Sequence, residues 1–285
     1  MPRFLAVGQV TRDRLARGEA LGGAALYAAQ AAHKLGLEAA ILTSAGPDFD
    51  PPRELPGVEV FRSPSPSTTR FANVYEDDGR RRQILSSRAD PIDLGVLPDA
   101  WRDPDLLLLA PVANEIGAMT AMAFGAQVVG ATAQGWLREF AADGAVSASA
   151  WRDPAADLAG VHVAFLSEHD LPAGDSPDAL LRLVPIVMVT RGWAGSTVLT
   201  RDARYDVPSL PREEVDPTGA GDVFAAGFLI RYFECGELIE AAAFGACAAS
   251  CAVEGIGATS LGDRAEVERR MILRERLIED GEWEE

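Results

Sequence analysis

The sequence predicts an α/β fold with a mostly parallel central sheet. Apolar segments of four to six residues alternate with helical segments along most of the chain, as in proteins whose strands are buried between two helical layers. The chain has 285 residues, of which 48% are hydrophobic, so it can bury a large core. No linker, repeat or low-complexity segment divides it, and we expect a single domain covering residues 1–285.

Strands are expected where a short apolar run is bounded by turn residues. These runs are 4–7, 39–43, 106–109, 127–131, 161–166 and 186–190, followed by a hairpin of 196–200 and 204–207. Helices are expected where apolar or small residues recur at helical spacing. The expected helices are an Ala-rich segment after Gly23 that ends at Leu35, then 115–124, 177–183, 219–233, 238–253 and 265–278.

Residues 58–88 follow a different pattern. Two extended runs, 68–76 and 81–85, flank Asp77-Asp78-Gly79, and an Asp-Gly pair between extended runs is a strong hairpin signal. We therefore expect a small antiparallel β lid formed mainly by 58–88, with 9–20 as a second contribution. Arg80, Arg81 and Arg82, just after the turn, are expected to be solvated at the lid edge.

Charge and cysteine content limit the partners. The formal net charge is −17, which repels nucleic acid phosphates and argues against nucleic-acid binding. The chain lacks a secretory signal pattern and the ~20 consecutive apolar residues of a membrane-spanning helix. Its three cysteines form no Cys-x-x-Cys pair, which favours a reducing compartment. We expect a cytoplasmic protein with no membrane partner.

The segment 215–228, VDPTGAGDVFAAGF, carries the chemistry. Its small residues let the backbone approach a ligand, and the amides of Gly219, Ala220 and Gly221 at the start of a helix would form an anion hole. Asp222 in the first helical turn could accept a proton from a hydroxyl beside a held phosphoryl group. In isolation, a glycine turn with Asp222 as a helix cap is an equally good interpretation of the short Gly-Ala-Gly-Asp string.

The longer string closely resembles the C-terminal motif of the PfkB (ribokinase-like) family of carbohydrate and nucleoside kinases. The match holds at Asp216, Thr218, the Gly-Ala-Gly-Asp run 219–222, Phe224 and Gly227. Further features occur in the family's order, from Gly8 and Asp13 through Gly22-Gly23 to the strand that ends at Thr190. The resemblance implies a ribokinase-like three-layer α/β/α fold with a β lid, using ATP and Mg²⁺.

The resemblance also implies roles for individual residues. Asp222 would be the catalytic base, with the anion hole of residues 219–221 beside it. Substrate contacts would come from Asp13, Gly22 and Gly23, and nucleotide contacts from Thr190, Gly192, Gly195 and Thr218.

The sequence departs from the family pattern at two places. Tyr27 stands where an Asn often contacts sugar, and Ser167 replaces the Asn of the family's Asn-x-x-Glu, leaving Asp170 as the candidate metal ligand. A stretch that includes Gln134 and Arg138 resembles an inositol-kinase-like branch. We add Tyr27, Gln134 and Arg138 to the candidate substrate-binding residues, although a surface role for Arg138 is an equally good interpretation.

The sequence therefore predicts a phosphotransferase that acts on a hydroxyl of a sugar, a myo-inositol-like cyclitol or a nucleoside. The alternative is a non-catalytic nucleotide- or sugar-binding relative of the same fold. An enzyme of this fold with another phosphoryl donor is a further alternative. Some relatives dimerise through the flap, so a homodimer is an open expectation.

Overall fold

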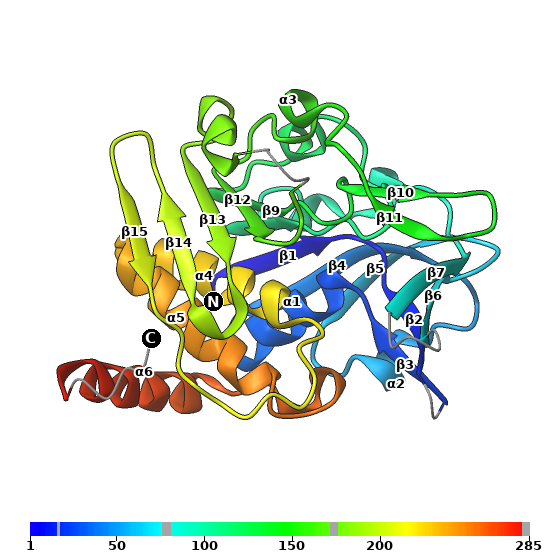
Figure 1. The fold of residues 1–285 in the computed structure, drawn as a ribbon. Coiled ribbons are helices and arrows are strands. Elements are labelled where there is room, and N and C mark those ends of the chain that lie inside the picture. The colour runs from blue at the N-terminus through cyan, green and yellow to red at the C-terminus, as the bar shows by residue number, and fades with distance from the viewer. Residues whose placement is uncertain (16–17, 76–80, 172–175, 281–285) are drawn as a thin grey trace.

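The computed structural model describes residues 1–15, 18–75, 81–171 and 176–280, and its centre is a nine-stranded sheet (Figure 1). The strands are β1 (Arg3–Val7), β4 (Glu38–Ala45), β5 (Glu59–Pro64), β8 (Leu106–Leu109), β9 (Val128–Thr132), β12 (Val163–Ser167), β13 (Ile186–Thr190), β14 (Ser196–Leu199) and β15 (Arg204–Val207). Their order across the sheet is β15-β14-β13-β12-β9-β8-β1-β4-β5. The strands from β13 to β5 are parallel, and β14 and β15 extend the sheet as an antiparallel hairpin. The predicted mostly parallel sheet is confirmed.

The longer helices cover one face of this sheet. They are α1 (Ala24–Lys34), α4 (Ala220–Cys235), α5 (Leu238–Ala252) and α6 (Arg264–Glu279), and α6 packs outside α5. Phe165 of β12 meets Phe228 of α4 edge-on, with ring centroids 5.5 Å apart. Cys247 and Cys251 of α5 are buried in the core. This packing holds the start of α4 at the carboxyl ends of the parallel strands.

Short helical turns cover the opposite face. They are 3-10 helices at Leu94–Val96, Asp99–Trp101, Thr120–Ala123 and Pro177–Arg182, with the short α-helix α3 (Pro154–Asp157). The other short α-helix, α2 (Pro51–Glu54), is followed by Leu55, which packs in the same core as α1. The predicted helix over 115–124 is wrong, because only its last part forms a 3-10 turn. The Glu115 carboxylate accepts hydrogen bonds from the amides of Gln9, Val112 and Ala113, at 2.7–3.1 Å. This local capping turns the chain back toward the strand ends.

A second, four-stranded sheet projects from the main body, at the right of Figure 1. It consists of β2 (Thr11–Leu15), β3 (Gly18–Gly22), β6 (Thr69–Tyr75) and β7 (Arg81–Ser87), in the order β3-β2-β6-β7. Two antiparallel hairpins, β2/β3 and β6/β7, are joined by the parallel pair β2/β6. Close by lies a further hairpin of β10 (Arg138–Phe140) and β11 (Val146–Ala148).

The lid prediction needs one correction. Residues 59–64 form β5, an edge strand of the central sheet parallel to β4, and do not belong to the small sheet. Within 9–20, expected as the second contribution to the lid, Asp13 lies on strand β2 of the small sheet. The expected turn at Asp77-Asp78-Gly79 and Arg80 lie outside the described residues, as do the side chains of Arg81 and Arg82.

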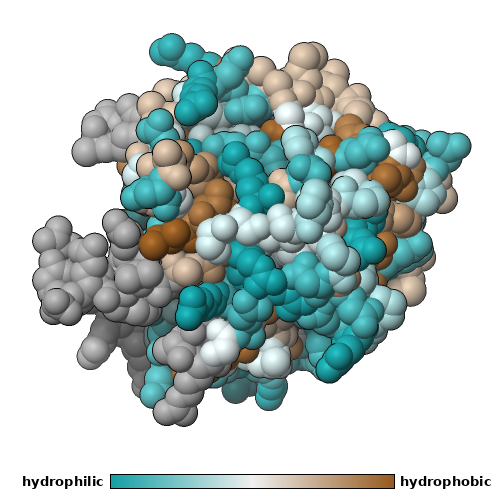
Figure 2. All heavy atoms as spheres, turned by 90° about the vertical axis from the view of Figure 1, so that its right-hand side faces the viewer, coloured by the Kyte–Doolittle hydropathy of each residue, from teal (hydrophilic) through white to brown (hydrophobic). Residues whose placement is uncertain are grey.

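The lid side of the molecule is mainly hydrophilic. Figure 2 shows that face with small, separate hydrophobic patches among polar residues. The homodimer stays a prediction. Within the part of the chain that the structure describes, no helix combines the length and the apolar character needed to span a membrane.

Candidate active site

A cleft of about 550 Å³ lies between the small sheet and the carboxyl ends of the central strands. Among the predicted site residues, those with polar side chains that line it include Asp13, Tyr27, Gln134, Arg138, Asp170, Thr190 and Asp222. They come from segments far apart in the sequence, and the parallel sheet brings them to one edge. Gly23 and Thr218 also line the cleft, whereas Gly22 lies beneath Asp13.

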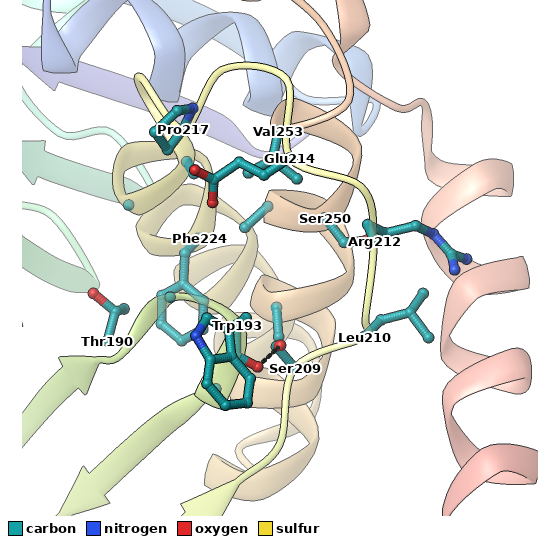
Figure 3. A pocket seen from close by; sticks show the side chains of 16 residues that line it. Thr190, Trp193, Ser209, Leu210, Arg212, Glu214, Pro217, Phe224, Ser250 and Val253 are labelled. Atoms are coloured by element: carbon teal, nitrogen blue, oxygen red, sulfur yellow. Dashed lines mark hydrogen bonds between the residues drawn. The ribbon is translucent and has the colours of Figure 1, made fainter. Parts of the chain in front are cut away.

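A smaller pocket of about 150 Å³ opens beside this cleft (Figure 3). Its lining includes three residues that the sequence predicts to contact the nucleotide, Thr190, Gly192 and Gly195. The two pockets share Ala220 and Gly221 as lining residues. The start of α4 therefore stands at the junction between the two pockets.

The backbone at the start of α4 is tightly constrained. Gly219 caps the helix with φ 82°, a conformation that favours glycine. A Cβ atom at this position would lie 2.4 Å from ring carbons of Tyr27, so only glycine fits against the ring. Tyr27 itself is buried and 4% exposed. The Tyr27 ring therefore packs directly against the Gly-Ala-Gly turn.

The amides of this turn differ in their availability. The amide of Ala220 donates to the carbonyl of Pro217 at 3.1 Å, so the turn itself uses it. Among the described residues, no protein acceptor is found for the amides of Gly219 and Gly221. Of the three amides predicted to hold an anion, these two are available to a ligand, with the helix dipole behind them.

Asp222 lies in the first turn of α4 and is partly exposed to the cleft. Burial raises the pKa of its carboxyl to about 7, an effect opposed by the positive charge of Arg138 and reinforced by Asp170. A carboxyl with this pKa can both accept and release a proton near neutral pH. The raised pKa, in a cleft, is typical of a functional carboxylate.

Asp13 is positioned by its neighbours on the β2/β3 hairpin. Its Oδ1 accepts a hydrogen bond of 3.0 Å from the hydroxyl of Thr11. A Cβ atom on Gly22 would lie 2.4 Å from the Asp13 Oδ2 atom, so the absence of a side chain at Gly22 makes room for the carboxylate. Gly22 therefore acts on the site through Asp13.

Arg138 and Asp170 also line the cleft, and Arg138 lies beside the small sheet. Arg138 donates from Nη1 to the carbonyl of Val112 at 3.2 Å, and its guanidinium lies 5.7 Å from the ring centroid of Phe71 on β6. Asp170 accepts from the amide of Ser167 at 2.7 Å. Burial raises the pKa of Asp170, although hydrogen bonds from Ser167 and Gln134 and the charge of Arg138 oppose the rise.

The carboxylates present suit a metal ion shared with a ligand. The described residues contain no cluster of three or more His, Cys, Asp or Glu that could hold a metal alone. Mg²⁺ is commonly bound by one or two carboxylates together with substrate phosphates. Asp170, close enough to Asp222 to raise its pKa, fits that mode of binding.

Comparison with known proteins points to one family. Residues 128–264 match the pfkB family of carbohydrate kinases, and this match includes Arg138, Asp170 and the whole Gly-Ala-Gly-Asp segment. The chain is similar to the PfkB family over this region. The other comparisons agree with this assignment and extend the likeness to the N-terminal half.

Two named sequence relatives illustrate the range of PfkB proteins that this chain resembles. A nucleoside kinase of Methanocaldococcus jannaschii is 40% identical over 99 residues, which is 33% of this chain and 33% of that protein. An inositol 3-kinase of Arabidopsis thaliana is 27% identical over 273 residues, covering 90% of this chain and 75% of that protein. In the first match, therefore, the chain spans only about a third of its relative's length.

Solved structures confirm the ribokinase-like fold of this chain. A pyrophosphate-dependent kinase in the ribokinase family, determined as a sulfate complex, aligns with a TM-score of 0.76 at 21% identity, covering 93% of this chain and 99% of that one. The ribokinase of Arabidopsis thaliana, complexed with ribose and ATP, aligns with a TM-score of 0.72 at 19% identity, covering 95% and 98%. At these identities the likeness establishes the fold alone.

Three residues of the two pockets were not predicted from the sequence. Trp193 and Phe71 line the pockets, and Thr132, at the end of β9, has a buried hydroxyl without a hydrogen-bond partner among the described residues. Trp193 comes directly after Thr190-Arg191-Gly192, which contains two predicted nucleotide contacts. This position in the sequence could have indicated that Trp193 lies in the site. Phe71 and Thr132 carry no local signal, because only the tertiary fold brings their strands to the cleft.

Proposed function

We propose that this protein is an ATP-dependent kinase that phosphorylates a hydroxyl of a sugar, cyclitol or nucleoside. One observation carries the proposal. Asp222, with a pKa raised to about 7, lies beside the ligand-accessible amides of Gly219 and Gly221, where the two pockets meet. A base next to an anion hole, between an acceptor cleft and a donor pocket, suits phosphoryl transfer.

In the proposed reaction the acceptor lies in the larger cleft and is oriented by Asp13. Asp222 accepts the proton of the reacting hydroxyl as its oxygen bonds to the γ-phosphorus of ATP. The bond between that phosphorus and the β–γ bridging oxygen breaks, and ADP leaves. The amides of Gly219 and Gly221 donate hydrogen bonds to the transferring phosphoryl group, and Asp222 then releases its proton to solvent.

Asp170 is proposed to hold magnesium together with the donor phosphates. When bound, Mg²⁺ neutralises phosphate charge during transfer. Arg138 contributes a fixed positive charge on the same side of the cleft. Thr190, Gly192, Gly195 and Thr218 are proposed to contact the nucleotide, because they line the two pockets beside the anion hole.

The charges of the cleft favour an uncharged acceptor. Five carboxylates and two arginines line it, namely Asp13, Glu168, Asp170, Asp216 and Asp222 with Arg138 and Arg191. Because the carboxylates outnumber the arginines, a further anionic group on the substrate would be repelled. Carboxylates and Gln134 suit the hydroxyls of a polyol. The likeness to an inositol 3-kinase over 90% of the chain supports a cyclitol as the preferred polyol. Tyr27 and Gln134 are the residues proposed to face the cyclitol ring.

The test is a survey of acceptors with Mg²⁺ and ATP. ADP release is measured with myo-inositol, free sugars, nucleosides and one sugar phosphate, and the product is identified by ³¹P NMR as a phosphate monoester. We expect turnover with an uncharged polyol and none with the sugar phosphate. Absence of turnover with every acceptor, combined with retained ADP binding, would favour the alternative of a non-catalytic nucleotide-binding relative.

A further inference from the structure

Trp193 is a large apolar side chain left in water at the mouth of the smaller pocket. Its relative exposure is 77%. It lines both pockets, and in Figure 3 its indole lies on the opposite side of the smaller pocket from Pro217 and Glu214. A single exposed hydrophobic side chain is common on protein surfaces, so the position of Trp193 matters more than its exposure. The indole stands at the edge of an apolar slot, where an aromatic ring can pack against a bound ligand.

The turn that carries Trp193 is held in place. It is a 3-10 turn, Gly192–Ala194, closed by hydrogen bonds between the amide of Arg191 and the carbonyl of Gly195, 2.8 Å, and between the amide of Gly195 and the carbonyl of Gly192, 3.1 Å. The hydroxyl of Ser209 donates to the Trp193 carbonyl at 2.6 Å (Figure 3). The indole is therefore presented from a defined backbone position and needs little ordering when a ligand arrives.

The pocket beneath the indole has the character of a slot for a flat ring. Phe224, 3% exposed, lines it from α4, and α5 contributes only small or branched side chains. These are Ala246, Ala249, Ser250 and Val253. The hydroxyl of Ser250 is already engaged by Cys247 and Arg270. The α5 wall thus offers mainly apolar contact, which suits an aromatic base.

The slot is continuous with the site of transfer. Pro217, Ala220 and Gly221 line both pockets. A donor whose terminal phosphate reaches the amides of Gly219 and Gly221 can therefore extend its other end into the slot. Pyrophosphate has no group to place there and would leave Trp193 in water.

We propose that Trp193 is a donor-specificity residue, whose indole stacks on the base of a nucleoside triphosphate and selects it over inorganic pyrophosphate. The inference rests on the proposed kinase function and deepens it. The preference for a nucleotide donor is inferred from Trp193, although one of the similar structures is a pyrophosphate-dependent kinase. ADP carries an adenosine group that pyrophosphate lacks. Comparing the affinities of the two ligands therefore distinguishes the contribution of the base from that of the phosphates.

The experiment measures the dissociation constants of ADP and of pyrophosphate, each with Mg²⁺, by isothermal titration calorimetry. The proteins are the full-length wild type, Trp193→Ala, Trp193→Phe and the control Tyr205→Ala. Tyr205 is also an exposed aromatic, 40% exposed, but lies outside this pocket. We expect Trp193→Ala to weaken ADP binding about tenfold or more, the usual scale of a base–aromatic stack, and to leave pyrophosphate binding unchanged. Trp193→Phe should retain most of the ADP affinity.

Three results would overturn the proposal: unchanged ADP affinity in Trp193→Ala, equal losses for ADP and pyrophosphate, or a loss in Trp193→Phe as large as that in Trp193→Ala. These readouts need no turnover. A protein that shows the expected binding pattern without any phosphoryl transfer would contradict the proposed function while leaving the base contact intact.

Discussion

The ring of Tyr27 lies so close to Gly219 that a Cβ atom on the glycine would be 2.4 Å from the ring carbons. This contact joins the first helix of the chain to the turn that begins α4. Where the family often has an asparagine, this chain has a tyrosine whose ring packs against the turn that we propose to bind an anion. Tyr27 therefore lies between the cleft proposed for the acceptor and the proposed anion hole.

The first prediction concerns this contact. Gly219→Ala should lower the free energy of unfolding by about 2 kcal/mol or more, because it adds a steric clash to an unfavourable φ angle. Gly236→Ala is the matched control. Gly236 also has a positive φ, 74°, but its Cβ would meet open space, so the cost there should be about 1 kcal/mol. Equal losses in urea unfolding of the two variants would contradict the role given to Tyr27.

The second prediction concerns Gly22 and Asp13. Gly22→Ala should displace the Asp13 carboxylate and raise the acceptor KM about tenfold, the scale of a lost hydrogen bond to a charged group, with kcat changed much less. Asp13→Asn should act in the same direction. Gly117→Ala is a suitable control, because its Cβ would meet only the Thr120 Oγ1 atom, at 3.9 Å. An unchanged acceptor KM in Gly22→Ala would argue against this positioning.

The third prediction is a pH dependence. The proton-accepting form of Asp222 is the carboxylate, and burial raises the pKa of this carboxyl to about 7. Turnover should therefore rise with pH through about 7 and then level off. Arg138 lowers the pKa of Asp222, so Arg138→Met should move this rise to higher pH by about one unit. Arg138→Lys keeps the charge and should move it less, and identical profiles for wild type and Arg138→Met would contradict the account.

The fourth prediction links the same group to stability. The pKa of Asp222 is raised in the folded protein, so between about pH 4 and pH 7 the folded state binds the proton more strongly than the unfolded state. The contribution of Asp222 to stability is therefore greatest at acid pH and is lost as pH rises toward 7. Asp222→Asn has no charge to bury, and its Tm should exceed that of the wild type by about 2 °C or more at pH 8. The difference should shrink toward pH 5, and a variant less stable than the wild type at pH 8 would contradict the burial argument.

The sequence predicted the strands and the long helices well because their signals are local. Strands β8 and β13 have the expected bounds, and α4, α5 and α6 differ from the expected helices by one or two residues. The exception is the segment 115–124, where apolar content suggested a helix. There the Glu115 carboxylate accepts hydrogen bonds from two amides nearby in the chain, those of Val112 and Ala113, and from the distant amide of Gln9. Such contacts leave no periodic pattern in the sequence.

The site was only partly predictable for the same reason. The Gly-Ala-Gly-Asp segment is contiguous, so its geometry follows from the start of one helix. The support of Gly219 by Tyr27 and the influence of Arg138 on Asp222 depend on how distant segments meet at the sheet edge. Likewise, the place of residues 59–64 in the central sheet follows from their parallel pairing with β4, which alternation in the sequence cannot distinguish from pairing in a lid.

The central claim is that Asp222 accepts the proton in phosphoryl transfer, and the most direct measurement compares Asp222→Asn with the wild type. Both proteins are assayed for acceptor-dependent ADP release with Mg²⁺ and ATP, using the best acceptor, and for ADP binding by calorimetry. The account predicts that turnover falls by about 100-fold or more, while ADP binds with nearly the wild-type affinity. Turnover within a few fold of the wild type would contradict it and leave Asp222 with only a structural role at the start of α4.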